Sequence, residues 1–140
     1  DARDFEPIVP ELKLSAELGI RFVFPNAPIR PVTINGGMQM RAWYDVLSLD
    51  LPRQEDADGV YASGQAINAL LEREKQRGIP AHRIVLAGFS QGGAMALYSG
   101  LRYPEPLAGI LALSCYIPLA GRVNDERRPA DIGVAPGVGY

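Results

Sequence analysis

The segment from Ile84 to Leu97 restricts the fold of this chain most, because a run typical of a strand ends at a serine and a run typical of a helix begins directly after it. It reads IVLAGFSQGGAMAL and contains Gly88-Phe89-Ser90-Gln91-Gly92, which matches the pattern G-x-S-x-G. In that pattern a serine occupies a strained turn between strand and helix, and small residues on either side relieve backbone crowding. The context predicts that Ser90 is a nucleophile; the alternative is a glycine-rich turn that serves packing only.

Short apolar runs, typical of strands, alternate along the chain with segments in which apolar residues recur at helical spacing. We expect buried strands over 20–24 and 84–87, a further strand over 107–113, and helices over about 60–77 and 91–101. Strands that alternate with helices of this length predict an α/β fold with parallel strands and right-handed crossovers. Asn35-Gly36, between two short apolar runs, predicts a hairpin outside that sheet, because both residues tolerate positive φ.

Composition narrows the class of protein. The 140 residues suffice for one domain, and a formal charge of -2 with scattered basic residues argues against binding of nucleic acid. Cys115 is the only cysteine, which rules out an internal disulfide and fits the cytoplasm. The longest strongly apolar stretch, 107–113, is far shorter than the roughly 20 residues that span a bilayer. One histidine and one cysteine predict no metal site.

Three blocks carry a resemblance to a known family. The blocks are FVFPNAPIRPVTINGGMQMRAWYDV, AHRIVLAGFSQGGAMAL and LALSCYIPLAG, and they resemble successive parts of the phospholipase/carboxylesterase family, which includes bacterial carboxylesterases and acyl-protein thioesterases. The resemblance implies an α/β-hydrolase fold with a mostly parallel sheet and flanking helices. It also implies hydrolysis of a small-molecule or acyl ester through a serine acyl-enzyme, without a cofactor. By this resemblance residues 1–121 are the central part of the hydrolase domain and 122–140 are an irregular, non-matching tail.

Several residues besides Ser90 are candidates for the site. The N–H of Gln91, at the start of a helix, is a candidate oxyanion donor. The resemblance places Trp43 and the loop that includes Met38 and Met40 near the acyl-binding cleft; a core aromatic is the alternative for Trp43. Cys115 is either a thiol near the cleft or, as we expect, a small packed residue.

The sequence lacks the histidine that Ser90 would use. In this fold the acid and the histidine follow the serine, yet His82 is the only histidine and lies at the far end of the strand, about 26 Å away. A truncated, frame-shifted or incomplete chain would explain this, and the alternative to an esterase is a catalytically silent remnant. A flavodoxin-like ligand-binding domain would share the alternating pattern but not require the serine. A homodimer is consistent with the sequence.

Overall fold

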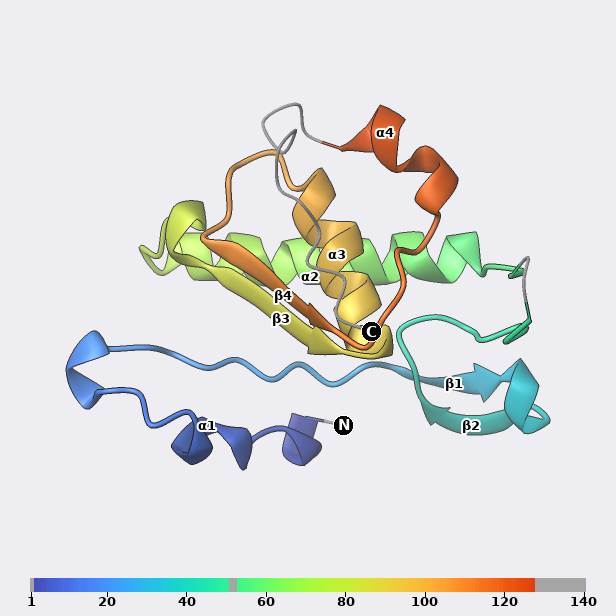
Figure 1. The fold of residues 1–140 in the computed structure, drawn as a ribbon, viewed down its shortest axis with the longest axis horizontal. Helices are drawn as coiled ribbons and strands as arrows, with labels where there is room; N and C mark the ends of the chain where they lie inside the picture. The colour runs from blue at the N-terminus through green and yellow to red at the C-terminus, as the bar shows by residue number, and fades with distance from the viewer. Residues whose placement is uncertain (1, 51–52, 128–140) are drawn as a thin grey trace.

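The computed structural model describes residues 2–50 and 53–127 and forms an α/β arrangement (Figure 1). The helices are α1 (Ile8–Glu11), α2 (Ala57–Gln76), α3 (Gln91–Arg102) and α4 (Val123–Glu126), and the strands are β1 (Ile29–Val32), β2 (Met38–Arg41), β3 (Val85–Phe89) and β4 (Gly109–Leu113). Short 3-10 turns η1 (Ala2–Asp4), η2 (Ala16–Leu18), η3 (Thr33–Asn35), η4 (Ala81–Arg83) and η5 (Ala120–Arg122) lie between them.

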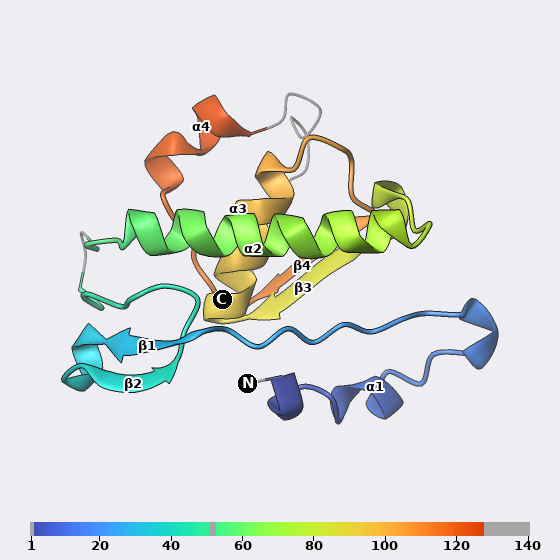
Figure 2. The same cartoon turned by 180° about the vertical axis from the view of Figure 1, so that it is seen from behind.

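Strands β3 and β4 pair in parallel, with Val85 opposite Gly109 and Phe89 opposite Leu113. Helix α3 connects them and packs on one face of the pair, and α2 packs against α3 (Figures 1 and 2). The predicted β–α–β order and the parallel pairing are therefore confirmed. Helix α3 agrees with its expected range to within one residue, whereas α2 begins three residues before and ends one residue before its expected range.

The predicted hairpin is also confirmed. Strands β1 and β2 are antiparallel and form a sheet of their own, separate from β3 and β4. The turn η3 and the two glycines after it connect the strands, and the positive φ values fall on Gly36 and Gly37, at 65° and 78°, and not on Asn35 as expected. Glycine enters this region without steric cost. The hairpin lies at the end of the molecule where α2 begins (Figures 1 and 2).

Two strand predictions were wrong in part. Residues 20–24 are extended but form no strand within the described residues, and Ile20 and Val23 remain about half exposed. Strand β3 was expected to be buried, yet Val85 and Phe89 are 56% and 52% exposed. Apolar content predicts an extended segment, but a strand also needs a hydrogen-bonded neighbour, and a buried strand needs a layer on each face. Within the described residues α3 packs on one face of β3, while Val85 and Phe89 remain about half exposed.

The core lies between α2, α3 and the segment that follows β2. Its buried members are Tyr44, Val60, Ile67, Ala94, Met95, Tyr98 and Leu119. Full burial of a side chain such as Met95, which is 1% exposed, stabilises the fold by about 2 kcal/mol. This cluster fixes the start of α3, and therefore Ser90, relative to α2.

The segment predicted to be irregular, 122–140, is helical at Val123–Glu126, where α4 makes one turn. The ion pair between Arg102 Nε and Glu126 Oε2, at 2.7 Å, joins that turn to the end of α3. The rest of the predicted tail, 128–140, lies outside the described residues. None of the helices in the described residues is both long and apolar enough to cross a membrane.

Candidate functional site

Ser90 lies on the turn between β3 and α3 in a strained backbone conformation. Its φ is 52° and its ψ is -122°, values that a residue with a side chain seldom adopts and that cost about 1–3 kcal/mol. The surroundings hold it there from both sides: Ser90 N donates to Leu113 O at 2.8 Å, and Ser90 O accepts from Ala94 N at 3.0 Å. Ser90 therefore makes both a hydrogen bond to the end of β4 and the first backbone hydrogen bond of α3.

The first N–H groups of α3 are directed toward the same region. Because the first intrahelical bond is the one from Ala94, the N–H groups of Gln91, Gly92 and Gly93 have no acceptor within the helix. Their partial positive charge, with the macrodipole of α3, favours negative charge beside Ser90. This arrangement can stabilise an oxyanion next to the serine hydroxyl.

The turn is crowded at Gly88 but open at Gly92. A Cβ on Gly88 would lie 2.2 Å from the backbone carbon and oxygen of Gly92, a distance at which something must shift. A Cβ on Gly92 would meet nothing within 4 Å. The steric requirement expected on both sides of the serine therefore applies at Gly88 and not at Gly92.

The Gln91 side chain anchors the segment that follows β2. Its Oε1 accepts from Trp43 N at 2.7 Å, and its Nε2 donates to Tyr44 O at 2.9 Å. Ser63 Oγ on α2 donates to the carbonyl of Trp43. Three hydrogen bonds therefore fix the backbone of residues 43–44 beside the turn.

A cleft of about 410 Å³ opens beside Ser90. Its lining comes from the turn at Ser90, from the residues after β4 and from the segment after β2: Tyr44, Val46, Ser48, Leu49, Arg53, Ser90, Gln91, Ser114, Cys115 and Tyr116. Burial, together with a hydrogen bond that the Tyr44 hydroxyl donates to Tyr116, raises the pKa of the Tyr44 phenol, so Tyr44 is neutral. Burial also raises the pKa of Cys115, which keeps this thiol protonated and a poor nucleophile at neutral pH.

The other predicted site residues lie outside the lining of this cleft. Met38 and Met40 are on β2, 62% and 37% exposed, and Met40 Sδ accepts from Asn35 Nδ2 at 3.2 Å. Trp43 is partly buried and packs against the core, while its backbone reaches Gln91. The structure brings Ser90, Gln91 and the Trp43 backbone together, and the substrate-binding roles of Trp43, Met38 and Met40 stay predictions.

Sequence reasoning missed Arg53, Tyr44 and Tyr116 as cleft residues. Tyr44 and Tyr116 each adjoin a residue that the sequence had singled out, Trp43 and Cys115, so proximity in sequence was the available signal. Arg53 lies near the start of the polar, acidic stretch 51–58 and carried no signal. His82 lies in η4, before β3 begins, as its place in the sequence indicated.

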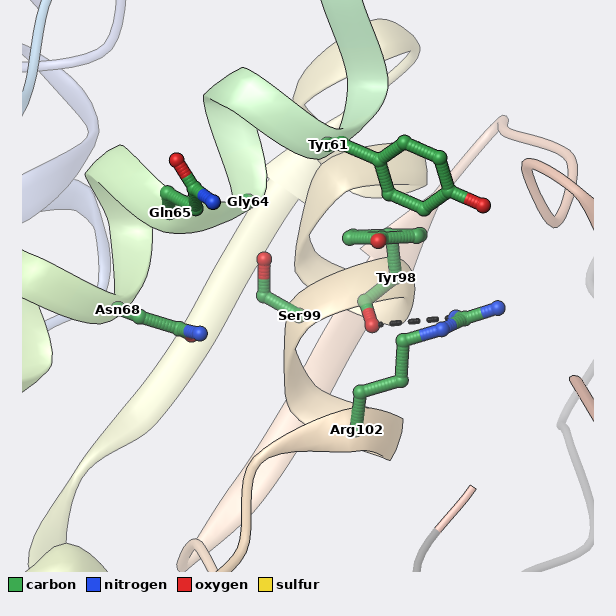
Figure 3. A pocket seen from close by; sticks show the side chains of 7 residues that line it. All are labelled: Tyr61, Gly64, Gln65, Asn68, Tyr98, Ser99 and Arg102. Atoms are coloured by element: carbon green, nitrogen blue, oxygen red, sulfur yellow. Dashed lines mark hydrogen bonds between the residues drawn. The ribbon is translucent and has the colours of Figure 1, made fainter. Parts of the chain in front are cut away.

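A smaller hollow of about 210 Å³ lies between α2 and α3 (Figure 3). Tyr61, Gly64, Gln65 and Asn68 line it from α2, and Tyr98, Ser99 and Arg102 line it from α3. It shares no lining residue with the Ser90 cleft. Across residues 2–50 and 53–127, no three His, Cys, Asp or Glu side chains cluster closely enough to hold a metal ion.

Comparison with known proteins finds relatives named acyl-protein thioesterase. The chain is 47% identical over 103 residues to acyl-protein thioesterase 1 of Schizosaccharomyces pombe, covering 74% of this chain and 46% of that protein. It is 45% identical over 119 residues to acyl-protein thioesterase 1 of Mycosarcoma maydis, covering 79% of this chain and 50% of that protein. The chain therefore spans about half the length of the curated relatives it matches.

Solved structures agree with the strand and helix order described above. SOBER1 of Arabidopsis thaliana superposes with a TM-score of 0.85 at 31% identity, over 91% of this chain and 62% of that one. Acyl-protein thioesterase 2 of Zea mays superposes with a TM-score of 0.76 at 29% identity, over 97% of this chain and 58% of that one. These neighbours are α/β-hydrolases, and this chain has their fold over the part that it spans.

The model of the phospholipase/carboxylesterase family matches residues 12–134. The match continues past Gly121, where the resemblance was expected to end, so the division at residue 121 stays a prediction. Because most of the chain matches that model, and because the relatives and the structures agree with it, this chain belongs to the phospholipase/carboxylesterase family.

Proposed function

We propose that this chain carries the nucleophile of a hydrolase that cleaves carboxylic esters or thioesters through an acyl-enzyme on Ser90. The observation that carries the proposal is the backbone of Ser90, strained at φ 52° and held between Leu113 O and Ala94 N at the start of α3. Strain of this kind is retained where the surrounding structure enforces it, and it gathers at functional sites. The relatives named acyl-protein thioesterase support the same reaction class.

The proposed reaction has two steps. Ser90 Oγ attacks the carbonyl carbon and loses its proton, and the Gln91 N–H stabilises the oxyanion of the tetrahedral intermediate. The intermediate collapses to an acyl-enzyme and releases the alcohol or thiol, which takes up a proton. A water molecule then attacks the acyl carbonyl, the bond to Ser90 Oγ breaks, the carboxylic acid leaves, and one proton of that water returns to Ser90 Oγ. The base that accepts the serine proton comes from outside the described site, because His82 lies before the start of β3.

The remaining expectations belong to the same proposal. Trp43, Met38 and Met40 are proposed contacts for the acyl chain, since the exposed thioethers of β2 suit flexible apolar groups. Residues 1–121 are the proposed central part of the hydrolase domain, followed by the segment 122–140. The single cysteine supports a cytoplasmic location. The exposed side chains of Val85 and Phe89 on β3 support self-association as a homodimer.

A second candidate is a catalytically silent domain whose cleft only binds. It is favoured by one observation: His82, the single histidine of the sequence, lies at the opposite end of β3 from Ser90. Without an imidazole at Ser90 the hydroxyl keeps its proton at neutral pH and reacts slowly.

Labelling with a fluorophosphonate separates the two candidates. The purified chain is treated with the probe, digested and analysed by mass spectrometry, beside Ser90→Ala and the matched control Ser114→Ala, which alters another serine of the same cleft. A hydrolase is labelled at Ser90, and only Ser90→Ala abolishes the label and the hydrolysis of p-nitrophenyl butyrate. Absent labelling, with ester hydrolysis equal in all three proteins, would favour the silent domain.

A further inference from the structure

Arg53 alone, among the described residues that line the Ser90 cleft, carries a full charge at neutral pH. The others are apolar or are neutral hydroxyl, amide and thiol groups. The guanidinium carbon of Arg53 lies 4.4 Å from the centre of the Tyr116 ring. Cation–π stacking of this kind positions the solvent-exposed guanidinium of Arg53 beside the wall of the cleft.

No carboxylate neutralises Arg53 within the part of the chain that the structure describes. The acidic residue closest in sequence, Glu55, uses its Oε1 to accept from Leu119 N at 2.9 Å. The ion pairs in the described ranges join other cations, such as Arg30 to Asp56 at 3.6 Å and Arg102 to Glu126 at 2.7 Å. The positive charge of Arg53 is therefore available to a ligand in the cleft.

The rest of the cleft lining also favours a negatively charged ligand. The first-turn N–H groups of α3 add partial positive charge at Ser90. Hydroxyl groups of Ser48, Ser114 and Tyr116 can donate to an anion without adding opposing charge. A cleft of about 410 Å³ accommodates a chain of several carbon atoms that ends in a carboxylate.

We propose that Arg53 makes this cleft select esters that carry a carboxylate a few atoms from the scissile bond, such as monoesters of short dicarboxylic acids. For turnover the inference rests on the proposed function; for binding it does not, because Arg53 holds the carboxylate whether or not Ser90 reacts. Arg53 is in this view a specificity-determining residue of the cleft.

Turnover is tested with two esters that differ in one charge: p-nitrophenyl hydrogen adipate, which is anionic, and methyl p-nitrophenyl adipate, which is neutral. The measured quantity is the ratio of their kcat/KM values. In Arg53→Gln this ratio falls about five- to tenfold, since an exposed ion pair supplies a modest preference. The matched control is Arg83→Gln, which removes the same charge from exposed η4 and leaves the ratio unchanged. Raising the salt concentration lowers the ratio of the unaltered chain.

Binding separates failure of this inference from failure of the proposed function. Monomethyl adipate and dimethyl adipate are each titrated into the Ser90→Ala variant. Backbone amide resonances and arginine Nε–H resonances are followed by NMR. Monomethyl adipate binds more tightly than dimethyl adipate and shifts Arg53 Nε–H, and Arg53→Gln weakens its binding about five- to tenfold. The inference is overturned if the two ligands bind equally, or if Arg53→Gln and Arg83→Gln weaken binding alike. If neither ester is turned over, that result counts against the proposed function. The binding experiment then decides the inference about Arg53.

Discussion

Gln91 and Trp43 are joined across the sequence by a hydrogen bond of 2.7 Å, in which the backbone N–H of Trp43 donates to the Gln91 side chain. The same side chain donates back to Tyr44 O at 2.9 Å. Gln91 thus has two separable parts: a backbone N–H beside Ser90, proposed to bind an oxyanion, and a side chain that anchors the neighbouring wall of the cleft.

Replacing Gln91 by methionine tests the anchoring part. The methionine has a similar volume but neither accepts from Trp43 N nor donates to Tyr44 O, so two partly buried backbone groups lose their partners. We expect a loss of about 1–3 kcal/mol in the free energy of unfolding, measured with urea. Gln91→Glu, which keeps the acceptor, loses less. The control Gln65→Met, at an exposed position on α2, changes stability by less than about 0.5 kcal/mol, and equal losses in Gln65→Met and Gln91→Met would refute the anchoring role.

Gly88 and Gly92 provide a matched pair on the two sides of Ser90. Gly88→Ala places a Cβ 2.2 Å from the backbone of Gly92, so it destabilises the chain by about 3 kcal/mol. Gly92→Ala meets nothing within 4 Å and lies in α3, where alanine is favoured over glycine by about 1 kcal/mol. In thermal unfolding, the melting temperature should therefore fall for Gly88→Ala and rise for Gly92→Ala. Similar losses in both would mean that the crowding is not specific to Gly88.

The sequence predicted the strand–turn–helix order around Ser90 and the two long helices well because their signals are local. Helical spacing, the glycine pattern and the Asn35-Gly36 turn each act within a few residues, and the structure has elements at all of these places. Residues 20–24 show the limit: an apolar run resembles a strand whether or not a partner lies beside it. The contact of Gln91 with Trp43 joins positions 48 apart, and the approach of Arg53 to Tyr116 is equally nonlocal, so no short pattern encodes either.

Asp56 connects the start of α2 to the loop and to the hairpin. Its Oδ1 accepts from Gly59 N at 2.9 Å as an N-cap, its Oδ2 accepts from Asp45 N at 2.8 Å, and Arg30 lies 3.6 Å away. Asp56→Ala removes all three contacts and costs about 2 kcal/mol in urea unfolding.

Two further variants control for this result. Asp56→Asn keeps acceptor capacity for the cap and recovers most of the loss, because asparagine caps helices about as well as aspartate. Asp58→Ala, which removes an exposed charge from the first turn of α2, costs only a few tenths of a kcal/mol. A loss for Asp58→Ala as large as that for Asp56→Ala would show that helix charge, and not the cap, is responsible.

Cys115 gives a pH-dependent prediction that uses the only thiol of the chain. Burial raises the pKa of Cys115 in the folded protein, whereas the unfolded chain has the ordinary value of about 8.5. At a pH between the two values the unfolded chain has released the thiol proton and the folded protein has kept it. The contribution of Cys115 to stability is therefore complete below about pH 8.5 and is lost as the pH rises toward the raised value.

Two measurements check the direction of this pH dependence. Alkylation of Cys115 by iodoacetamide, followed from pH 7 to 10, should accelerate at a higher pH in the folded chain than in the same chain in urea. Urea unfolding at pH 8 and pH 9.5 should show a steeper alkaline loss of stability for the unaltered chain than for Cys115→Ala, whose slope lacks the thiol contribution. Tyr44, whose pKa is also raised by burial, is present in both proteins, so its contribution cancels in the difference between the slopes. Alkylation profiles that coincide for folded and unfolded chains would mean that the thiol is not desolvated beside the cleft.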